Sequence, residues 1–245
     1  MALHVTLGLC AFLAALLVYR YDLYEREPWY MLVLGVAAGG VAMRLVGAVE
    51  LVSLGYVESS VAIAAVAALH EELARLLVVL AIALVFTRQF NDPMDGLVYG
   101  SMVGLGMALE ESFYLLGLLD VPGAIRLPVE LVRLLGHLVM GGIVGFGVGL
   151  AWVDSQGWRG KLILCFLVST GLHFAWDWIA LDVSDTTSLS IYQTAASIAV
   201  MLFGMMFYGA LVHVGSTLSK GMFAPESRAS LWGWPFKALS RKGDK

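Results

Sequence analysis

Seven long apolar stretches divide this chain, and they constrain its fold more than any other feature of the sequence. Each is close to the roughly 20 mostly apolar residues that a helix needs to cross about 30 Å of hydrocarbon. They lie at approximately residues 2–19, 29–54, 60–86, 96–119, 129–153, 160–180 and 191–216. Since 60% of the chain is hydrophobic and only 14% is charged, the stretches predict an all-α, polytopic membrane helix bundle of about seven transmembrane helices.

The segments that join these stretches are too short to fold alone, so residues 1–219 are expected to form one transmembrane domain. Residues 220–245 would follow it as a basic tail that contains Trp232 and Trp234. Cytoplasmic loops of membrane proteins are enriched in Lys and Arg. One side of the predicted bundle collects the loop cations Arg20, Arg26, Arg88, Arg159 and Lys161 together with those of the tail. We therefore expect the C-terminus in the cytoplasm and the N-terminus outside.

Two further patterns bear on partners and on packing. A formal net charge of −4 leaves no basic face for a phosphate backbone, so the expected surroundings are a lipid bilayer and not nucleic acid. Glycines recur at a spacing of four along two predicted helices, at positions 96, 100 and 104 and at positions 141, 145 and 149. Such ladders predict close packing of helix backbones.

Ionisable side chains lie inside the predicted spans, where each costs at least about 2.5 to 3.5 kcal/mol at the centre of the bilayer. They come from five of the predicted helices: Arg44, His70, Glu71, Glu72, Arg75, Glu110, Glu111, Arg133, His137, His173 and Asp177. If these eleven groups were scattered through the hydrocarbon, their total free-energy cost would be very large. We therefore expect them to converge on a shared polar cavity.

Helical spacing supports this convergence, because residues four apart lie on one helix face. The spacing pairs Glu71 with Arg75, Glu110 with Tyr114, Arg133 with His137, and His173 with Asp177. Counted at about 1.5 Å per residue, the depth from the outer end of each helix is about 17 Å for Glu71, 14 Å for Glu110, 12 Å for His137 and 10 Å for His173. The polar cavity is expected in the outer half of the bilayer.

The residue types in this cavity suit the hydrolysis of an amide bond. Adjacent carboxylates at Glu71 and Glu72 repel each other in a site of low dielectric, so one of them is suited to take a proton from water. A histidine can protonate a leaving amine or stabilise an oxyanion, and Asp177 is expected to fix the tautomer of His173. The alternative is a set of buried ion pairs, such as Glu71 with Arg75, that only fix the register of the helices.

Five segments together resemble the PrsW family of intramembrane proteases, which is related to the CAAX prenyl-protease and bacteriocin-processing superfamily. They are EPW at Glu27–Trp29, EELAR at Glu71–Arg75, DPMDGLVYGSMVGLGMALEESFY at Asp92–Tyr114, RLLGHLVMGGIVG at Arg133–Gly145 and HFAWD at His173–Asp177. Each segment alone is a weak signal. As an ordered set over residues 20–180 they indicate the family strongly.

The resemblance implies a role for each matching residue. Glu71 and Glu72 would form the catalytic glutamate pair, Glu110 would belong to the second motif, and His137 and His173 would be the two motif histidines. Arg75, Glu111, Tyr114, Arg133 and Asp177 would support them. This chain has Arg75 where the family usually has Lys, and Glu111 where it usually has Asn. The implied substrate is a membrane-anchored regulatory protein, such as an anti-sigma factor, cleaved near the outer face of a bacterial membrane.

The sequence itself requires no cofactor, although the resembling family is classified both as glutamate-dependent and as metal-dependent. If a metal is present, zinc is the expected ion, and Glu72, Glu110, His137 and His173 are the expected ligands. No helix carries the HExxH spacing that places two imidazoles on one metal.

Two other functions remain open at this point. A proton-coupled transporter or channel would also place Glu, His and Asp across several helices. A membrane scaffold whose catalytic motif has decayed is the second, because Glu111 departs from the family pattern.

Overall fold

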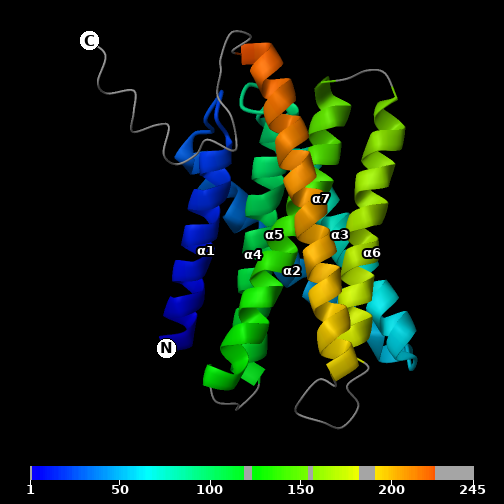
Figure 1. Ribbon diagram of the computed structural model, residues 1–245. Coiled ribbons are helices and arrows are strands. Elements are labelled where there is room, and N and C mark those ends of the chain that lie inside the picture. Colours follow the sequence, from blue (N-terminus) through cyan, green and yellow to red (C-terminus); the bar gives the residue numbers. More distant parts are fainter. Residues whose placement is uncertain (1, 119–122, 154–156, 182–190, 224–245) are drawn as a thin grey trace.

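Within the described residues the chain forms seven long helices, and these confirm the expected all-α membrane bundle. The computed structural model describes residues 2–118, 123–153, 157–181 and 191–223. The helices are α1 (Ala2–Tyr21), α2 (Trp29–Ser53), α3 (Ser60–Val85), α4 (Pro93–Leu118), α5 (Gly123–Val153), α6 (Trp158–Leu181) and α7 (Ile191–Phe223), with a 3-10 turn, η1, at Leu54–Tyr56. The first residue of α1 and the last of α7 lie at opposite ends of the bundle (Figure 1). Residues 220–223 of the expected tail continue α7, and residues 224–245 lie outside the described residues.

Five of these helices are long and apolar enough to cross a membrane by themselves: α1, α2 with η1, α5, α6 and α7. The other two, α3 and α4, each have 26 residues, but charged residues interrupt their apolar sequences. The charges of α3 do not face lipid, because Glu71, Glu72 and Arg75 are all buried. Interior burial thus explains how α3 can share the bundle with five plainly hydrophobic spans.

The α4 helix is buried over most of its length and packs mainly against α5 and α2. The two glycine ladders face each other across the contact between α4 and α5. A Cβ atom at Gly100 would collide with the carbonyl oxygen of Gly141, and one at Gly145 would collide with that of Gly96. The predicted close packing of backbones is therefore confirmed, since a larger residue at either position would push the two helices apart.

This packing also determines which helices can build a site together. The α6 helix contacts both α3 and α5, while α7 packs against α5 and α6 (Figure 1). Polar side chains on the facing sides of α3, α5 and α6 therefore meet inside the bundle.

A buried acidic cluster lies where α1 ends and α4 begins. Asp22, Glu27, Asp92 and Asp95 are each at most 4% exposed. The backbone N–H of Glu27 donates to Asp22 Oδ2 over 3.2 Å, and the Tyr99 hydroxyl donates to the Glu27 carboxyl group. This cluster connects the loop after α1 to α4. Acidic residues of the EPW and DPMD segments thus have a structural use away from the histidines.

Stability is expected to fall as the pH rises from about 4 to about 8 because of Asp22. Burial, with Asp95 and Asp92 nearby, raises the pKa of Asp22 from its ordinary value of 3.8 to about 8. The folded protein keeps this proton at a pH where the unfolded chain has released it, so the stabilisation is complete below about pH 4 and is lost above about pH 8. Asp22→Asn should reduce the fall in melting temperature between pH 5 and pH 9 by several degrees. Thermal unfolding of the detergent-solubilised protein measures this difference, with exposed Glu58→Gln as the control. Equal pH dependence in Asp22→Asn and the unmodified protein would contradict the expectation.

Candidate active site

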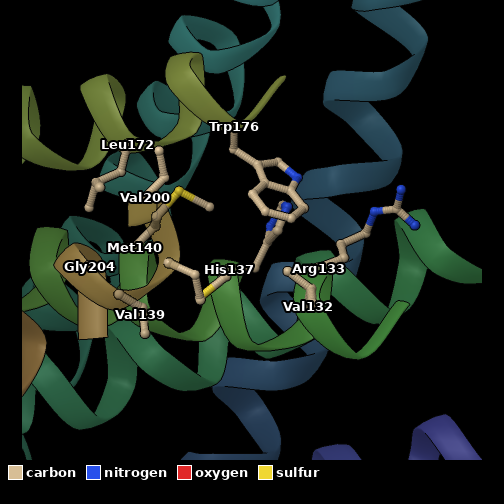
Figure 2. A pocket seen from close by; sticks show the side chains of 11 residues that line it. Val132, Arg133, His137, Val139, Met140, Leu172, Trp176, Val200 and Gly204 are labelled. Carbon is tan, nitrogen blue, oxygen red and sulfur yellow. The ribbon is translucent and has the colours of Figure 1, made fainter. Parts of the chain in front are cut away.

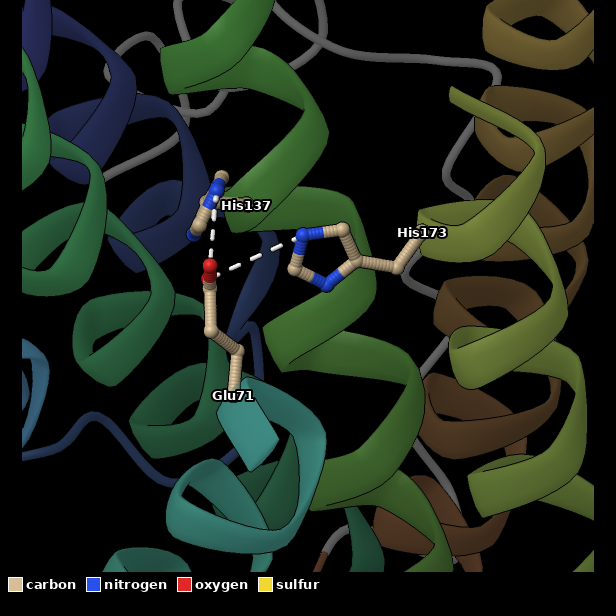
Figure 3. Close-up of side chains that lie close together, drawn as sticks. All are labelled: Glu71, His137 and His173. Carbon is tan, nitrogen blue, oxygen red and sulfur yellow. Dashed lines mark ion pairs between the residues drawn. The ribbon is translucent and has the colours of Figure 1, made fainter. Parts of the chain in front are cut away.

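Glu71 lies between two imidazole rings that come from two other helices (Figure 3). Its Oε2 atom is 3.8 Å from Nε2 of His137 on α5 and 3.6 Å from Nε2 of His173 on α6. The three residues are 5%, 4% and 2% exposed, respectively. The two rings also face each other edge to face, with their centroids 5.3 Å apart. Three helices thus bring one carboxylate and two imidazoles to a single point inside the bundle.

The neighbouring carboxylate, Glu72, is fully buried and has several partners. Nδ1 of His173 donates to Glu72 Oε1 over 2.9 Å, and the Ser169 hydroxyl donates to Oε2 over 2.6 Å. Arg75 forms an ion pair with the same carboxylate. By contrast, Glu71 Oε2 is buried and accepts no hydrogen bond from any described residue. The two glutamates, which are equivalent by residue type, therefore occupy different environments.

Arg75 is completely buried and links Glu72 to His137. Its Nη2 atom donates to His137 Nδ1 over 3.0 Å. Because arginine can only donate, Nδ1 must accept, and a neutral His137 then carries its proton on Nε2, the atom that faces Glu71. The expected pairing of Arg75 with Glu71 is wrong, because Arg75 pairs with Glu72; positions three apart share a helix face as positions four apart do.

The α4 helix contributes Glu111 to this group of residues. Its Oε2 atom is 3.3 Å from His137 Nε2, and its Oε1 atom is 3.1 Å from Arg133 Nε. Arg133 also pairs with Glu130, which accepts a hydrogen bond of 2.7 Å from the Ser112 hydroxyl. Glu130 is only 1% exposed, and it was not expected at the site because it lies at the edge of a predicted span. The spacing of three residues between Glu130 and Arg133 could have predicted this ion pair, because residues three apart share a helix face.

Glu110 and Tyr114, which share a face of α4, do not join the histidines. Glu110 pairs with Arg44 over 3.1 Å, where the side chains are 30% and 70% exposed. Tyr114 is 42% exposed. Adjacent helical residues point about 100° apart, so only one of Glu110 and Glu111 can face the histidines. His70, next to Glu71, is half-buried, and no described residue is bonded to its Nδ1 atom.

Two more carboxylates lie around His173. Asp177 Oδ2 is 3.5 Å from His173 Nε2, on the opposite side of the ring from Nδ1. The expectation that Asp177 fixes the tautomer of His173 is therefore wrong, because Glu72 accepts the Nδ1 proton. Glu50, in the last turn of α2, acts electrostatically on Glu111, His173 and Asp177. Glu50 was not expected at the site, because it stands near a helix end, where an exposed glutamate is common.

Glu71, His137 and His173 form a group that is close enough to hold a metal ion, since one ligand atom of each lies within 4.8 Å of the others. This set has Glu71 in place of Glu72 and lacks Glu110, because Glu72 is occupied by its partners and Glu110 faces Arg44. Glu71 Oε2 and His173 Nε2 suit a cation, and Glu72 supports His173 as carboxylates support ligand histidines in metal sites. His137 does not suit one as placed, because Arg75 holds the proton of a neutral ring on Nε2. Glu71 and His173 could therefore bind a cation as they stand. His137 could do so only after its Nδ1 atom gave up the contact with Arg75.

The comparisons with known proteins agree with this architecture. The profile of a family described as PrsW family intramembrane metalloprotease matches residues 27–212. Protease PrsW of Bacillus subtilis (strain 168) is 32% identical over 181 residues, which cover 70% of this chain and 80% of that protein. Protease PrsW of Geobacillus kaustophilus (strain HTA426) is 35% identical over 96 residues, which cover 38% of this chain and 40% of that protein. No solved structure matches the chain significantly. This chain is an integral membrane protein that belongs to the PrsW family of intramembrane proteases.

Proposed function

We propose that this intramembrane protease cleaves a membrane-anchored regulatory protein with Glu71 as the base that activates water. The observation that carries the proposal is the position of Glu71 Oε2. It is buried, it accepts no hydrogen bond from a described residue, and it lies within 4 Å of two imidazole nitrogens. A free carboxylate oxygen in such a place can accept a proton from water, whereas Glu72 is already bonded on both oxygens.

The first half of the reaction adds water to the scissile carbonyl group. Glu71 takes one proton from the water while the water oxygen bonds to the carbonyl carbon. Negative charge then develops on the carbonyl oxygen. The Nε2–H group of His137, 3.8 Å from Glu71 Oε2, would stabilise this oxyanion, because the Arg75 contact at Nδ1 keeps the proton on Nε2.

The second half breaks the carbon–nitrogen bond. The proton held by Glu71 passes to the leaving amine, and His173, whose Nε2 atom lies 3.6 Å from Glu71, assists this transfer. Glu72, Arg75 and Ser169 are positioning residues in this scheme, since they bond to the histidines or to each other. If a divalent cation is bound, Glu71 and His173 would hold it, with His137 as a third ligand only after its contact with Arg75 is exchanged, and the cation would polarise water and the scissile carbonyl group.

The location of the group supports cleavage near the outer face. His173 lies eight residues before the end of α6 at Leu181 and fifteen after its start at Trp158, so the group is nearer the end opposite the basic loops. Loops rich in Arg and Lys favour the cytoplasmic side, which supports a position of the histidines in the outer half of the bilayer. A single-span protein with a regulatory role, such as an anti-sigma factor, is the substrate class that we propose. Membership of a protease family favours this function over the transporter and the scaffold.

Replacement of His173 tests the proposed chemistry. His173→Ala is expected to lower cleavage of a single-span substrate by about 100-fold or more, because it removes an acid–base group from the reaction. His213→Ala is the matched control, since His213 is exposed on α7 and should leave the rate unchanged. The assay uses purified protein in liposomes and follows cleavage on gels. Unchanged cleavage in His173→Ala would reject the proposal. Metal analysis of the unmodified protein and of His173→Ala then distinguishes two roles of His173. Negligible metal in both proteins supports the acid–base role. Loss of a stoichiometric ion in His173→Ala would assign His173 as a metal ligand.

A further inference from the structure

A pocket opens between α5, α6 and α7 next to the histidines (Figure 2). Its empty volume is about 350 Å³, which includes the part that is open to the outside. Most of its lining is apolar or glycine: Val132, Gly136, Val139, Met140, Leu172, Trp176, Val200, Met201 and Gly204. The two polar lining residues are Arg133 and His137. The guanidinium group of Arg133 extends away from the other side chains (Figure 2), toward its partners Glu111 and Glu130. His137 is therefore the polar side chain at the pocket itself.

The pocket and the candidate active site share His137. This residue lines the pocket, and its Nε2 atom lies 3.8 Å from Glu71 Oε2. A peptide whose scissile carbonyl group reached Glu71 would thus place an adjoining side chain close to the pocket. An apolar lining rejects a charged side chain, because the charge would lose its hydration without gaining a partner.

We propose that this pocket receives an apolar side chain of the substrate next to the scissile bond, and that Gly136 and Gly204 set the size of side chain it accepts. The inference rests on the proposed function, since it takes Glu71 as the place of reaction. Methionine side chains line the pocket at Met140 and Met201, and their flexible thioethers adapt to aliphatic groups of different shapes. The substrate class is therefore a membrane-anchored protein with an aliphatic residue beside its cleavage site.

The two glycines offer a direct way to change the pocket without moving a helix. A Cβ atom at Gly136 would approach nothing nearer than Met201 Cε at 3.5 Å, and one at Gly204 nothing nearer than Val139 Cγ1 at 3.4 Å. These are ordinary van der Waals distances, so alanine fits at either position. The added methyl group would occupy space that the substrate side chain needs.

The experiment compares substrates that carry Ala, Leu, Phe or Asp beside a cleavage site mapped by mass spectrometry. We expect the unmodified protein to cleave the Leu substrate at least about 10-fold faster than the Asp substrate. Gly136→Ala and Gly204→Ala should shift the preference between Leu and Ala by about 10-fold toward Ala. Gly209→Ala is the matched control on α7, because nothing lies within 4 Å of a Cβ atom there. It should leave the preference unchanged.

A variant that enlarges the pocket keeps the test valid if the glycine variants fail to fold. Met201→Ala removes a side chain from the lining and should shift the substrate preference toward Phe, whereas the glycine variants should shift it toward Ala. An unchanged preference in all three pocket variants overturns the inference.

Glu71→Gln separates this failure from failure of the proposed function. If Glu71→Gln is inactive while the pocket variants never shift the preference, only the pocket is rejected. If Glu71→Gln remains active while the preference shifts as expected, the pocket stands and the base assignment is wrong.

Discussion

Glu71→Gln is expected to lower the rate of substrate cleavage by about 100- to 10,000-fold while the protein keeps its fold. Glutamine has the size and shape of glutamate, but it cannot take a proton from water. Glu71 Oε2 has no hydrogen bond from a described residue, so the substitution removes little that holds the helices together. Cleavage of a single-span substrate in liposomes measures the rate, and thermal unfolding measures the fold.

Glu110→Gln is the matched control on the fourth helix. Glu110 was expected at the catalytic group from its motif, but it pairs with Arg44 away from the histidines. Its substitution should change the cleavage rate by no more than about threefold, in keeping with a weak, partly exposed ion pair. The reverse pattern, with an active Glu71→Gln and an inactive Glu110→Gln, would place the chemistry on the other face of α4 and contradict the proposed site.

Arg75→Met is expected to destabilise the protein by about 3 to 5 kcal/mol, the largest stability loss among the substitutions considered. Arg75 is completely buried, and its removal leaves the Glu72 charge in the interior without its cation. His137 would also lose the donor that fixes its tautomer. Unfolding of the purified protein in detergent measures the loss of free energy, and cleavage should fall in parallel.

Two companion variants identify the cause of this loss. Arg88→Met removes an exposed arginine from the loop before α4 and should change stability by at most about 0.5 kcal/mol. Glu72→Gln added to Arg75→Met should recover part of the stability, because it neutralises the stranded carboxylate. Arg75→Lys keeps the charge, and should be more stable than Arg75→Met although lysine cannot reproduce the forked contact with Glu72 and His137. An Arg75→Met protein as stable as Arg88→Met would mean that Glu72 needs no cation.

Much of the fold could be predicted because its signals are local in the sequence. Stretches of apolar residues marked the helices to within about three residues, except that α5 begins six residues earlier, at Gly123, and α7 ends seven residues later, at Phe223. The glycine ladders indicated close packing of helix backbones, and the structure shows that the two ladder helices, α4 and α5, pack against each other. The same reasoning placed Glu71, His137 and His173 near a common depth, and the structure brings these three together. Length, hydropathy and rise per residue are enough for such conclusions, because a helix in a bilayer must satisfy its own backbone hydrogen bonds.

The division of roles within the site needed the tertiary structure. Sequence alone could not say that Glu111 faces the histidines and Glu110 faces Arg44. Nor could it say that Glu72 is bonded on both oxygens while Glu71 Oε2 accepts no hydrogen bond from a described residue. It also passed over Glu50, which the end of α2 brings toward the same group. The physical reason is rotation: hydrophobicity determines that a segment crosses the membrane, but contacts with neighbouring helices determine which of two adjacent residues turns inward.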